Sequence, residues 1–270
     1  MRKPRPWTTE RVRVPTAEGG LTDLDGALGI IRRLREAGHQ AYLVGGAVRD
    51  LLMGRPPHDV DIVTDAHPEQ IVQLFPRTVP VGASFGVVLV PTESGVYDVA
   101  TFRREGPYLD GRRPSFVEYA TLEEDVRRRD FTVNSLLYDP LGGSVVDLVG
   151  GREDLAARRI RTVGDPEARF AEDHLRMLRA MRLAAELGFT IDDETFQAIQ
   201  RHAPDIMRVS AERIRDELLR LLVSPGRAAG LEELRESGLL RQILPEVAAM
   251  EGVEQPPEFH PEGDVFSHTR

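Results

Sequence analysis

The 270-residue sequence has no cysteine, and Lys3 is its only lysine. The absence of cysteine excludes disulfide bonds, cysteine-bound zinc and thiol nucleophiles, and it fits a reducing compartment. Long hydrophobic runs are also missing, because nowhere do about 18 apolar residues follow one another as a membrane-spanning helix needs. The basic N-terminus has no apolar segment behind it. We therefore expect a cytoplasmic protein without a signal peptide or a membrane span.

The formal net charge of −9 argues on its own against a nucleic-acid partner, because polyanions usually bind to basic surfaces. The positive charge is nearly all arginine, and much of it lies in two stretches, residues 103–129 and 152–182. The base composition of the genome explains a preference for arginine equally well. A phosphate group responds to the local field rather than to the net charge, so these stretches remain compatible with a polyanionic partner.

The first 21 residues combine prolines and glycines with little periodicity, which predicts a flexible N-terminal arm over residues 1–21. From residue 22 onward, helical and strand patterns alternate. We expect helices at 24–37, 47–53, 68–75, 122–129 and 131–138, and strands at 41–44, 59–64, 85–90, 96–102 and 144–148. This is a mixed α/β pattern with a small sheet.

Beyond residue 164 the pattern becomes entirely helical. We predict a long helix over 165–187, a second over 192–202 and a strongly amphipathic third over 211–223. The chain therefore divides into an α/β head over 22–164, a helical neck over 165–206 and a helical body over 207–258.

Two aspartates, Asp59 and Asp61, alternate along the predicted strand 59–64, so both side chains point to one face. Their backbone positions stand about 7 Å apart, and the carboxylates could converge on magnesium for two-metal phosphoryl transfer. Asp98, in the next strand but one, is the best candidate for a third carboxylate. The alternative for an isolated Asp-x-Asp is the polar outer face of a half-buried strand.

Gly45-Gly46 ends the strand before this pair, so a phosphate can approach bare backbone amides there, and Arg49 lies one helical turn further on. A di-glycine turn is weak evidence by itself. This turn has neither the Gly-x-x-x-x-Gly-Lys-Ser/Thr pattern of a P-loop nor the Gly-x-Gly-x-x-Gly pattern of a dinucleotide fold, and we propose neither of these phosphate sites.

Four motifs together resemble those of one family. Leu43 to Leu52, followed by Asp59-Val-Asp61, is similar to the first motif of class II tRNA nucleotidyltransferases and bacterial poly(A) polymerases. Residues 97–103 resemble the strand that holds that family's third carboxylate, residues 128–134 its ribose-recognition motif, and residues 172–182 its nucleotide-reading motif. Chance agreement of four motifs in the family's order is negligible.

The resemblance implies a nucleotidyltransferase head of the polymerase-beta-like type at 22–164, followed by a neck with a nucleotide-reading helix and a helical body. It implies that Asp59, Asp61 and Asp98 bind Mg²⁺ and carry the catalysis. It further implies that a larger set of residues binds the nucleotide: Gly45, Gly46, Arg49, Arg129, Asp130, Asn134, Glu172, Asp173, Arg176, Arg179 and Arg182.

Within that set, Asp130 and Asn134 are expected near the ribose hydroxyls, and Arg179 and Arg182 at the stacked base or the triphosphate. On one helix, Asp173 and Arg176 would share a face. Asp173 could accept from the exocyclic amine of cytosine or adenine while Arg176 donates to the ring nitrogen, whereas uracil and guanine would present a carbonyl to the carboxylate. The alternatives are an ordinary Glu172 to Arg176 salt bridge here and a solvated charge run at residues 127–129.

Two further segments carry weaker resemblances. The arginine-rich segment 103–114 resembles the loop with which family members switch from C to A addition, and this favours a protein able to add A. Residues 259–268 resemble the opening of an HD phosphohydrolase domain, which we interpret as a truncated start of such a domain over 259–270. Because the later His-Asp pair of that domain is absent, we predict no hydrolase activity.

The predicted function is template-independent addition of CMP and AMP, from CTP and ATP, to the 3′ end of tRNA by two-metal phosphoryl transfer, that is, CCA addition or repair. The alternatives are a poly(A) polymerase, which shares all four motifs, and an enzyme that adds only part of CCA. Segment 81–90 and Asp98 depart from the residues of many CCA-adding members and leave these alternatives open. A non-catalytic RNA-binding or nucleotide-sensing protein is disfavoured because all three carboxylates are present.

Overall fold

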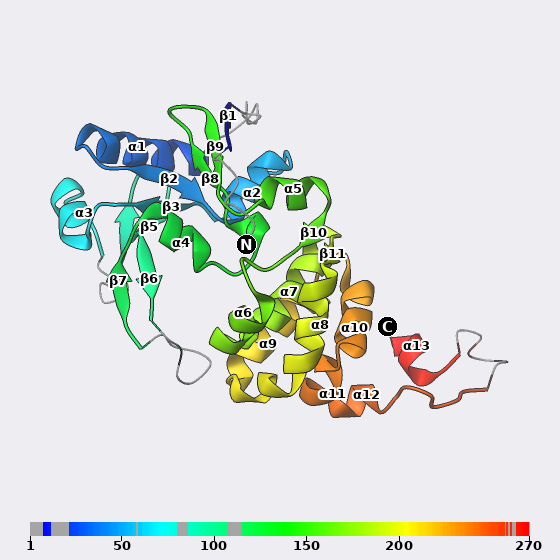
Figure 1. The fold of residues 1–270 in the computed structure, drawn as a ribbon. Helices are drawn as coiled ribbons and strands as arrows, with labels where there is room; N and C mark the ends of the chain where they lie inside the picture. Colours follow the sequence, from blue (N-terminus) through cyan, green and yellow to red (C-terminus); the bar gives the residue numbers. More distant parts are fainter. Residues whose placement is uncertain are drawn as a thin grey trace. The chain divides into compact units, whose positions relative to one another are not determined.

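The computed structural model describes residues 8–11, 22–57, 59–79, 86–106, 108, 115–256, 258, 260 and 263–269 (Figure 1). The chain forms two compact units. The first comprises Met1–Gly106 with Ser115–Leu155, and the second comprises Pro107–Pro114 with Ala156–Arg270. The main sheet belongs to the first unit, and a series of helices makes up most of the second.

The first unit is built on a seven-stranded sheet with the strand order β1-β9-β8-β2-β3-β5-β4. The pairing of β3 with β5 is parallel and the other pairings in this sheet are antiparallel, which confirms the predicted mixed sheet. The strands are β1 (Thr8–Arg11), β2 (Ala41–Val44), β3 (Asp61–Thr64), β4 (Val87–Pro91), β5 (Val96–Thr101), β8 (Leu137–Asp139) and β9 (Ser144–Asp147).

Helices cover both faces of this sheet. Helix α1 (Thr22–Glu36) buries Ala27, Ile30, Ile31 and Leu34, at the spacing that gives one helical face, in a core shared with α2 (Gly46–Leu52) and α3 (Pro68–Leu74). A smaller cluster, formed by Val44, Val63, Phe102, Val126 and Leu137, contains a side chain of α4 (Leu122–Arg127). Because neighbouring residues of β2 and β3 enter the two different clusters, the clusters lie on opposite faces.

Three local predictions for this unit are wrong. The second strand begins at Asp61 rather than Asp59. Residues 131–138, expected as a helix, form a short 3-10 turn, η2 (Thr132–Asn134), and then enter β8. The segment from Phe131 to Leu137 is too short for its periodicity to separate helix from strand, and the pairing of Leu137 with β2 makes its end a strand. Residues Thr8–Arg11, inside the expected arm, pair with β9 as an edge strand.

The segment 103–114 begins with β6 (Arg103–Glu105), which pairs antiparallel with β7 (Val117–Tyr119). The two strands form a hairpin that is separate from the main sheet. Residues 107 and 109–114, which contain most of the predicted loop, lie outside the described residues. So does residue 85, where the strand observed as β4 was expected to begin.

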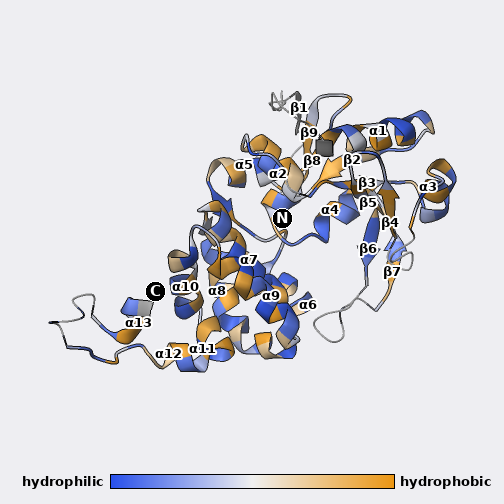
Figure 2. Ribbon diagram, turned by 180° about the vertical axis from the view of Figure 1, so that it is seen from behind, coloured by the Kyte–Doolittle hydropathy of each residue, from blue (hydrophilic) through white to orange (hydrophobic). Residues whose placement is uncertain are grey.

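The second unit consists of helices around a small parallel pair, β10 (Arg159–Ile160) with β11 (Thr190–Ile191). Buried α7 (Leu175–Leu187) packs against α9 (Ala211–Leu222) and α10 (Arg227–Glu236). The helices vary in hydropathy around their circumference, as amphipathic helices do (Figure 2). The others are α6 (Pro166–Glu172), α8 (Asp193–His202), η3 (Ala203–Arg208), α11 (Leu239–Ile243), α12 (Pro245–Ala248) and α13 (Val265–Thr269).

The helices of the described ranges are all too short or too polar to cross a lipid bilayer. Part of the segment that resembles an HD domain is described. There the rings of His260 and His268 lie edge to face, with centroids 5.0 Å apart.

Gly151 begins α5 (Gly151–Ala156), directly against the turn η2. An added Cβ would stand 2.2 Å from the carbonyl oxygen of Thr132 and 3.0 Å from Leu136. Because backbone has to shift to relieve this contact, we expect Gly151→Ala to lower the free energy of unfolding by about 1 to 3 kcal/mol, measured by urea denaturation.

Gly29 provides the matched control in the same unit, since it is exposed on α1 and an added Cβ meets nothing within 4 Å. We expect Gly29→Ala to raise the free energy of unfolding by about 0.5 to 1 kcal/mol through helix propensity. Similar changes in both variants would show that the close approach at Gly151 does not limit stability.

Candidate active site

Asp61 and Asp98 lie side by side because β3 and β5 are parallel neighbours. In the register of this pair Ile62 stands opposite Val99, so the preceding residues, Asp61 and Asp98, are adjacent and point to the same side. Both are exposed, whereas the residues that follow them are fully buried. The spacing of adjacent strands, about 4.8 Å, is close enough for two carboxylates to bind one cation.

Asp59 lies just before β3 and lines the same cavity. This cavity has a volume of about 480 Å³ and is lined by Asp59, Val60, Asp61, Gly95, Val96, Tyr97 and Asp98. Because Asp59 precedes the strand, the alternation argued from the sequence does not set its direction. All three carboxylates therefore line one cavity, although β3 orients only Asp61.

The electrostatics of Asp61 show how closely these charges interact. Surrounding protein displaces water from Asp61 and so raises its pKa, and the neighbouring charge of Asp98 raises it further. Arg129 acts in the opposite direction, and Asp59 adds a smaller upward shift. The negative charge at this cavity is therefore only partly compensated by protein groups.

The carboxylates of this cavity fit the way in which proteins usually bind magnesium. Among the described residues, no three His, Asp or Glu side chains converge closely enough to hold a metal by themselves. Magnesium, however, usually keeps several waters and is bound by one or two carboxylates together with substrate phosphates. Adjacent Asp61 and Asp98, whose negative charge protein groups compensate only in part, match that requirement.

The glycine turn between β2 and α2 lies against Asp61. Gly45 has φ 78° and ψ −141°, a conformation that favours glycine, and an added Cβ there would stand 3.9 Å from Asp61 Oδ2. The Arg49 side chain folds back over Gly46 and is nearly buried. Its Nη1 donates to Asn134 Oδ1 at 2.7 Å, which joins the turn to the 128–134 motif.

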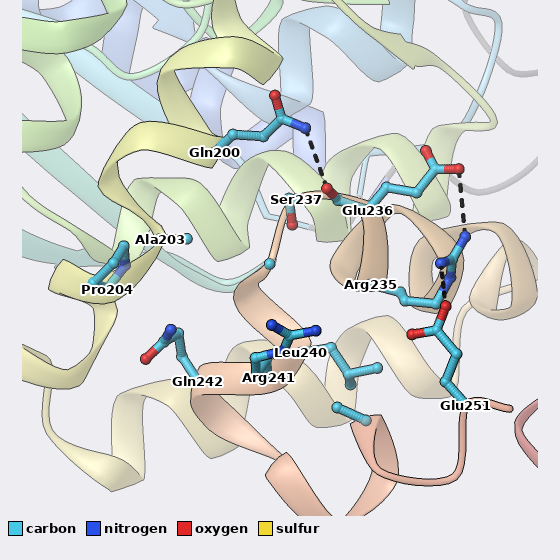
Figure 3. A pocket seen from close by; sticks show the side chains of 12 residues that line it. Gln200, Ala203, Pro204, Arg235, Glu236, Ser237, Leu240, Arg241, Gln242 and Glu251 are labelled. Atoms are coloured by element: carbon cyan, nitrogen blue, oxygen red, sulfur yellow. Dashed lines mark hydrogen bonds and ion pairs between the residues drawn. The ribbon is translucent and has the colours of Figure 1, made fainter. Parts of the chain in front are cut away.

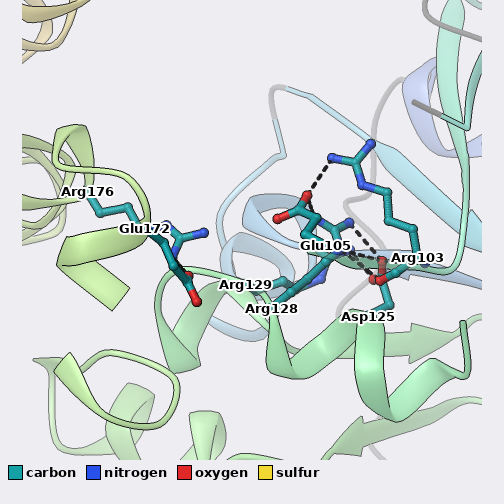
Figure 4. Close-up of polar contacts among 7 residues, drawn as sticks. All are labelled: Arg103, Glu105, Asp125, Arg128, Arg129, Glu172 and Arg176. Atoms are coloured by element: carbon teal, nitrogen blue, oxygen red, sulfur yellow. Dashed lines mark hydrogen bonds and ion pairs between the residues drawn. The ribbon is translucent and has the colours of Figure 1, made fainter. Parts of the chain in front are cut away.

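That motif connects α4 to β8. Arg129 donates to Asp125 Oδ2 at 2.9 Å, and Asp130 accepts from the backbone amide of Phe131 at 2.8 Å. Figure 4 shows Arg128 and Arg129 beside Asp125. The first unit thus brings together seven of the predicted site residues, with Asp59 on the same cavity: Gly45, Gly46, Arg49, Asp61, Asp98, Arg129 and Asn134. Asp130 follows Arg129 directly in the chain.

In the second unit, the predicted helix over 165–187 is wrong at Asp173, which breaks it into α6 and α7. Asp173 is extended, with φ −138° and ψ 105°, and its Oδ1 accepts from the amide of Leu175 at 3.1 Å. Aspartate often competes with helical hydrogen bonds in this way. Its Oδ2 accepts from Arg213 of α9 at 2.9 Å.

Arg176, in the first turn of α7, remains close to Asp173, since its amide donates to the Asp173 carbonyl at 3.0 Å. Its guanidinium pairs with Glu172 Oε2 at 2.5 Å and donates to the Arg169 carbonyl. The ordinary salt bridge considered from the sequence is therefore present, and it fixes the orientation of Arg176 (Figure 4).

Arg182 is buried between α7 and α9, where it pairs with Glu217 and Glu186 at 2.5 Å each. Arg179 pairs with the other oxygen of Glu217 at 3.5 Å. These ion pairs favour a structural role for Arg182 in joining the two helices. The sequence revealed α9 only as an amphipathic helix, and nothing in its pattern distinguished Arg213 or Glu217.

A second cavity, of about 390 Å³, lies within the second unit and is lined by residues of η3, α10, α11 and α12 (Figure 3). Its acidic groups are already compensated, because Glu251 pairs with Arg235 at 2.8 Å and Glu236 lies 3.8 Å from the same guanidinium. This cavity lacks the uncompensated carboxylates that phosphoryl transfer requires.

Comparisons with known proteins agree with this geometry. Residues 41–161 match the family model described as Poly A polymerase head domain, and residues 188–251 match that described as Probable RNA and SrmB-binding site of polymerase A. The CCA-adding enzyme of Geobacillus stearothermophilus is 48% identical over 226 residues, 83% of this chain and 55% of that protein. That of Streptococcus pyogenes is 47% identical over 209 residues, 77% and 52% of the two chains.

The fold is similar to that in the crystal structure of the Bacillus stearothermophilus CCA-adding enzyme in complex with CTP. The TM-score is 0.74 at 46% identity, over 80% of this chain and 52% of that one. This chain spans about half the length of the curated relatives that it matches.

Replacing Asp98 by asparagine should stabilise the folded chain at neutral pH. The raised pKa of Asp61 means that folding disfavours its ionised form, a penalty fully present at pH 7 and lost as the pH falls through that raised pKa toward 3.8. We expect Asp98→Asn to raise the thermal midpoint at pH 7 by about 1 to 3 °C and to have little effect near pH 3, measured by circular dichroism.

Asp139→Asn serves as the control, because Asp139 pairs with Arg35 at 3.1 Å and its loss should lower the midpoint at pH 7. A gain for Asp98→Asn that persisted near pH 3 would mean that repulsion from Asp61 is not its cause.

Proposed function

Because the chain belongs to the family of class II tRNA nucleotidyltransferases and bacterial poly(A) polymerases, we propose that it adds CMP and AMP, from CTP and ATP, to the 3′ end of tRNA. The observation that carries this proposal is the pair Asp61 and Asp98 on adjacent parallel strands, beside a glycine turn and Arg129. It is supported by relatives named CCA-adding enzyme that are nearly half identical to the chain. We expect this activity in the cytoplasm.

Magnesium is the proposed cofactor. Asp61 and Asp98 would hold it, with Asp59 available in the same cavity. Bound there, the metal would activate the attacking ribose hydroxyl and neutralise charge on the triphosphate. Arg129, whose positive charge acts on Asp61, would attract the same triphosphate. The turn at Gly45 and Gly46 presents no side chain that would obstruct a phosphate.

A hydrogen bond between Arg49 and Asn134 fixes the side chains on the proposed ribose side of the site. Their 2.7 Å hydrogen bond uses the Asn134 oxygen and leaves its amide group to donate. Asp130, two residues before the start of η2, is half-buried and supplies an acceptor. Hydroxyl groups can satisfy both a donor and an acceptor, which fits the proposed ribose contact.

Base selection is assigned to Asp173 and Arg176. Each is held by another side chain, Asp173 by Arg213 and Arg176 by Glu172, so neither has to be ordered when a nucleotide binds. Cytosine and adenine offer the same amine donor and ring-nitrogen acceptor to this pair. A uracil or guanine would leave buried polar groups unpaired, at a cost of roughly 1 to 3 kcal/mol for each.

A poly(A) polymerase is the second candidate, because residues 41–161 match the head-domain model of that name. The decisive experiment offers the protein a tRNA that lacks its 3′ CCA, with each nucleoside triphosphate singly and all four together. We expect addition of C, C and A, which then stops. Open-ended A addition would instead support the poly(A) polymerase.

Asp61→Asn and Asp98→Asn are expected to reduce nucleotide addition at least about a thousandfold, because each removes a proposed metal ligand. Asp139→Asn, which leaves the cavity intact, should retain activity. Unimpaired addition by Asp61→Asn would exclude this carboxylate pair as the catalytic site.

Asp173→Ala should lower the preference for CTP and ATP over UTP and GTP by about ten- to a hundredfold. This corresponds to the loss of one or two polar contacts that distinguish the bases. Arg213→Ala is expected to act in the same direction but more weakly, because it frees the Asp173 carboxylate without removing it. The measurement is kcat/KM for each nucleotide.

Arg215→Ala is the matched control on the same helix, since Arg215 is exposed and pairs with its neighbour Asp216. Selectivity that is equal in Asp173→Ala and in the unmodified chain would remove Asp173 from base reading.

A further inference from the structure

Asp125 is a charged side chain with no exposure at all, and the sequence motifs assign it no function. It lies on α4, three and four residues before Arg128 and Arg129. Its Oδ1 accepts from Arg128 Nε at 3.0 Å, from Arg128 Nη2 at 2.8 Å and from the backbone amide of Arg103 at 3.2 Å. Its Oδ2 accepts from Arg129 Nη2 at 2.9 Å (Figure 4).

These arginines keep Asp125 ionised. Burial by itself would raise the pKa of Asp125, but Arg129 and Arg128 outweigh it and hold the pKa below its usual value. A fully buried charge of this kind is tolerated only where paired donors satisfy it. The carboxylate is therefore a fixed negative anchor at neutral pH.

Arg129 depends on that anchor. In the described part of the chain, the hydrogen bond to Asp125 is the only one that the Arg129 side chain makes, and its buried Nε has no partner. The 128–134 motif that carries Arg129 lies against the same glycine turn as Asp61, because an added Cβ at Gly45 would stand 3.9 Å from Asp61 Oδ2 and 4.0 Å from the carbonyl oxygen of Asn134. The positive charge of Arg129 also acts on Asp61 and lowers its pKa. Asp125 thus fixes where the positive charge stands relative to the proposed metal site.

Arg128 shows that the anchor is divided between two arginines with different surroundings. Besides its two bonds to Asp125 Oδ1, Arg128 pairs with Glu105 of β6 at 3.0 Å. Arg128 is thus held by two acidic side chains, Asp125 and Glu105. Among the described residues, Arg129 is the side chain that donates to Asp125 Oδ2. Loss of the Asp125 charge would leave Arg128 with Glu105 and would release Arg129.

We propose that Asp125 is a positioning residue for nucleotide binding: it holds Arg129 beside the carboxylate cavity, where the guanidinium meets the triphosphate. This inference rests on the proposed function, in which Arg129 contacts the nucleotide. Asp125 touches neither the nucleotide nor the metal ligands. Its effect passes entirely through Arg129, and this separates the proposal from a general contribution of Asp125 to folding.

The test is a double-mutant cycle on CTP binding in the full chain with magnesium, measured by titration calorimetry. Asp125→Asn keeps the size of the side chain but turns an amide toward one of the arginines, and we expect it to raise the Kd for CTP about tenfold, as Arg129→Ala does. The double variant should bind CTP no more weakly than Arg129→Ala alone, because the two changes remove the same contact. The KM for the tRNA should stay unchanged.

Asp147→Asn is the control for a purely structural carboxylate. Asp147 accepts from the backbone amides of Val149, Gly150, Gly151 and Arg152 in the same unit, so its variant should lower the thermal midpoint without changing the Kd for CTP. Should Asp125→Asn fail to fold, Asp125→Glu keeps the charge and is expected to bind CTP better than Arg129→Ala does. The same cycle with Arg129→Ala then applies.

Multiplicative effects of the two changes on Kd, or a Kd for CTP that Asp125→Asn leaves unchanged in a folded chain, would overturn the inference alone. Absence of CTP binding by the unmodified chain would overturn the proposed function and the inference with it.

Discussion

The repulsion between Asp61 and Asp98 is the interaction around which the first unit is organised. Like charges on adjacent strands destabilise a sheet, and here the protein around Asp61, which displaces water from its carboxylate, adds to the cost. The sheet supports the pair because the residues that follow, Ile62 and Val99, are fully buried in the core shared with α1, α2 and α3 and fix the register. A slip of one residue would bury the carboxylates, so the hydrophobic core and the placement of the charges depend on each other.

Many arginines of this chain form ion pairs with acidic side chains of their own unit. The two arginine-rich stretches suggested a surface for polyanions, yet the structure pairs many of these arginines with acidic side chains of the same unit: Arg103, Arg104, Arg128, Arg129, Arg169, Arg176, Arg179 and Arg182. Several of the acidic partners are buried, as Asp125 and Glu217 are. The net charge of −9 is thus compatible with anion binding, because the acids position the arginines rather than oppose the ligand.

The sequence predicted the elements whose pattern is long or chemically distinctive. The spacing of Leu24, Leu28, Ile31 and Leu34 predicted α1, and the glycine pair predicted the turn before α2. The predictions for short segments were wrong where pairing with another strand decides the secondary structure, as at Leu137. The long predicted helix was wrong where one side chain competes with the helical hydrogen bonds, as at Asp173. The partners Asp125 and Arg213 could not be predicted, because each acts through a hydrogen bond whose geometry only the folded backbone defines.

Buried anchors and exposed charges respond differently to solvent, and this suggests why the two kinds are separated in the molecule. Ions screen exposed pairs over about 8 Å at physiological ionic strength, but they reach a fully buried carboxylate such as Asp125 far less. The position of Arg129 should therefore be almost independent of salt, whereas attraction of an RNA backbone falls steeply with it. In the proposed function, the nucleotide geometry must stay constant while RNA binds and leaves, and buried determinants of that geometry such as Asp125 meet this requirement.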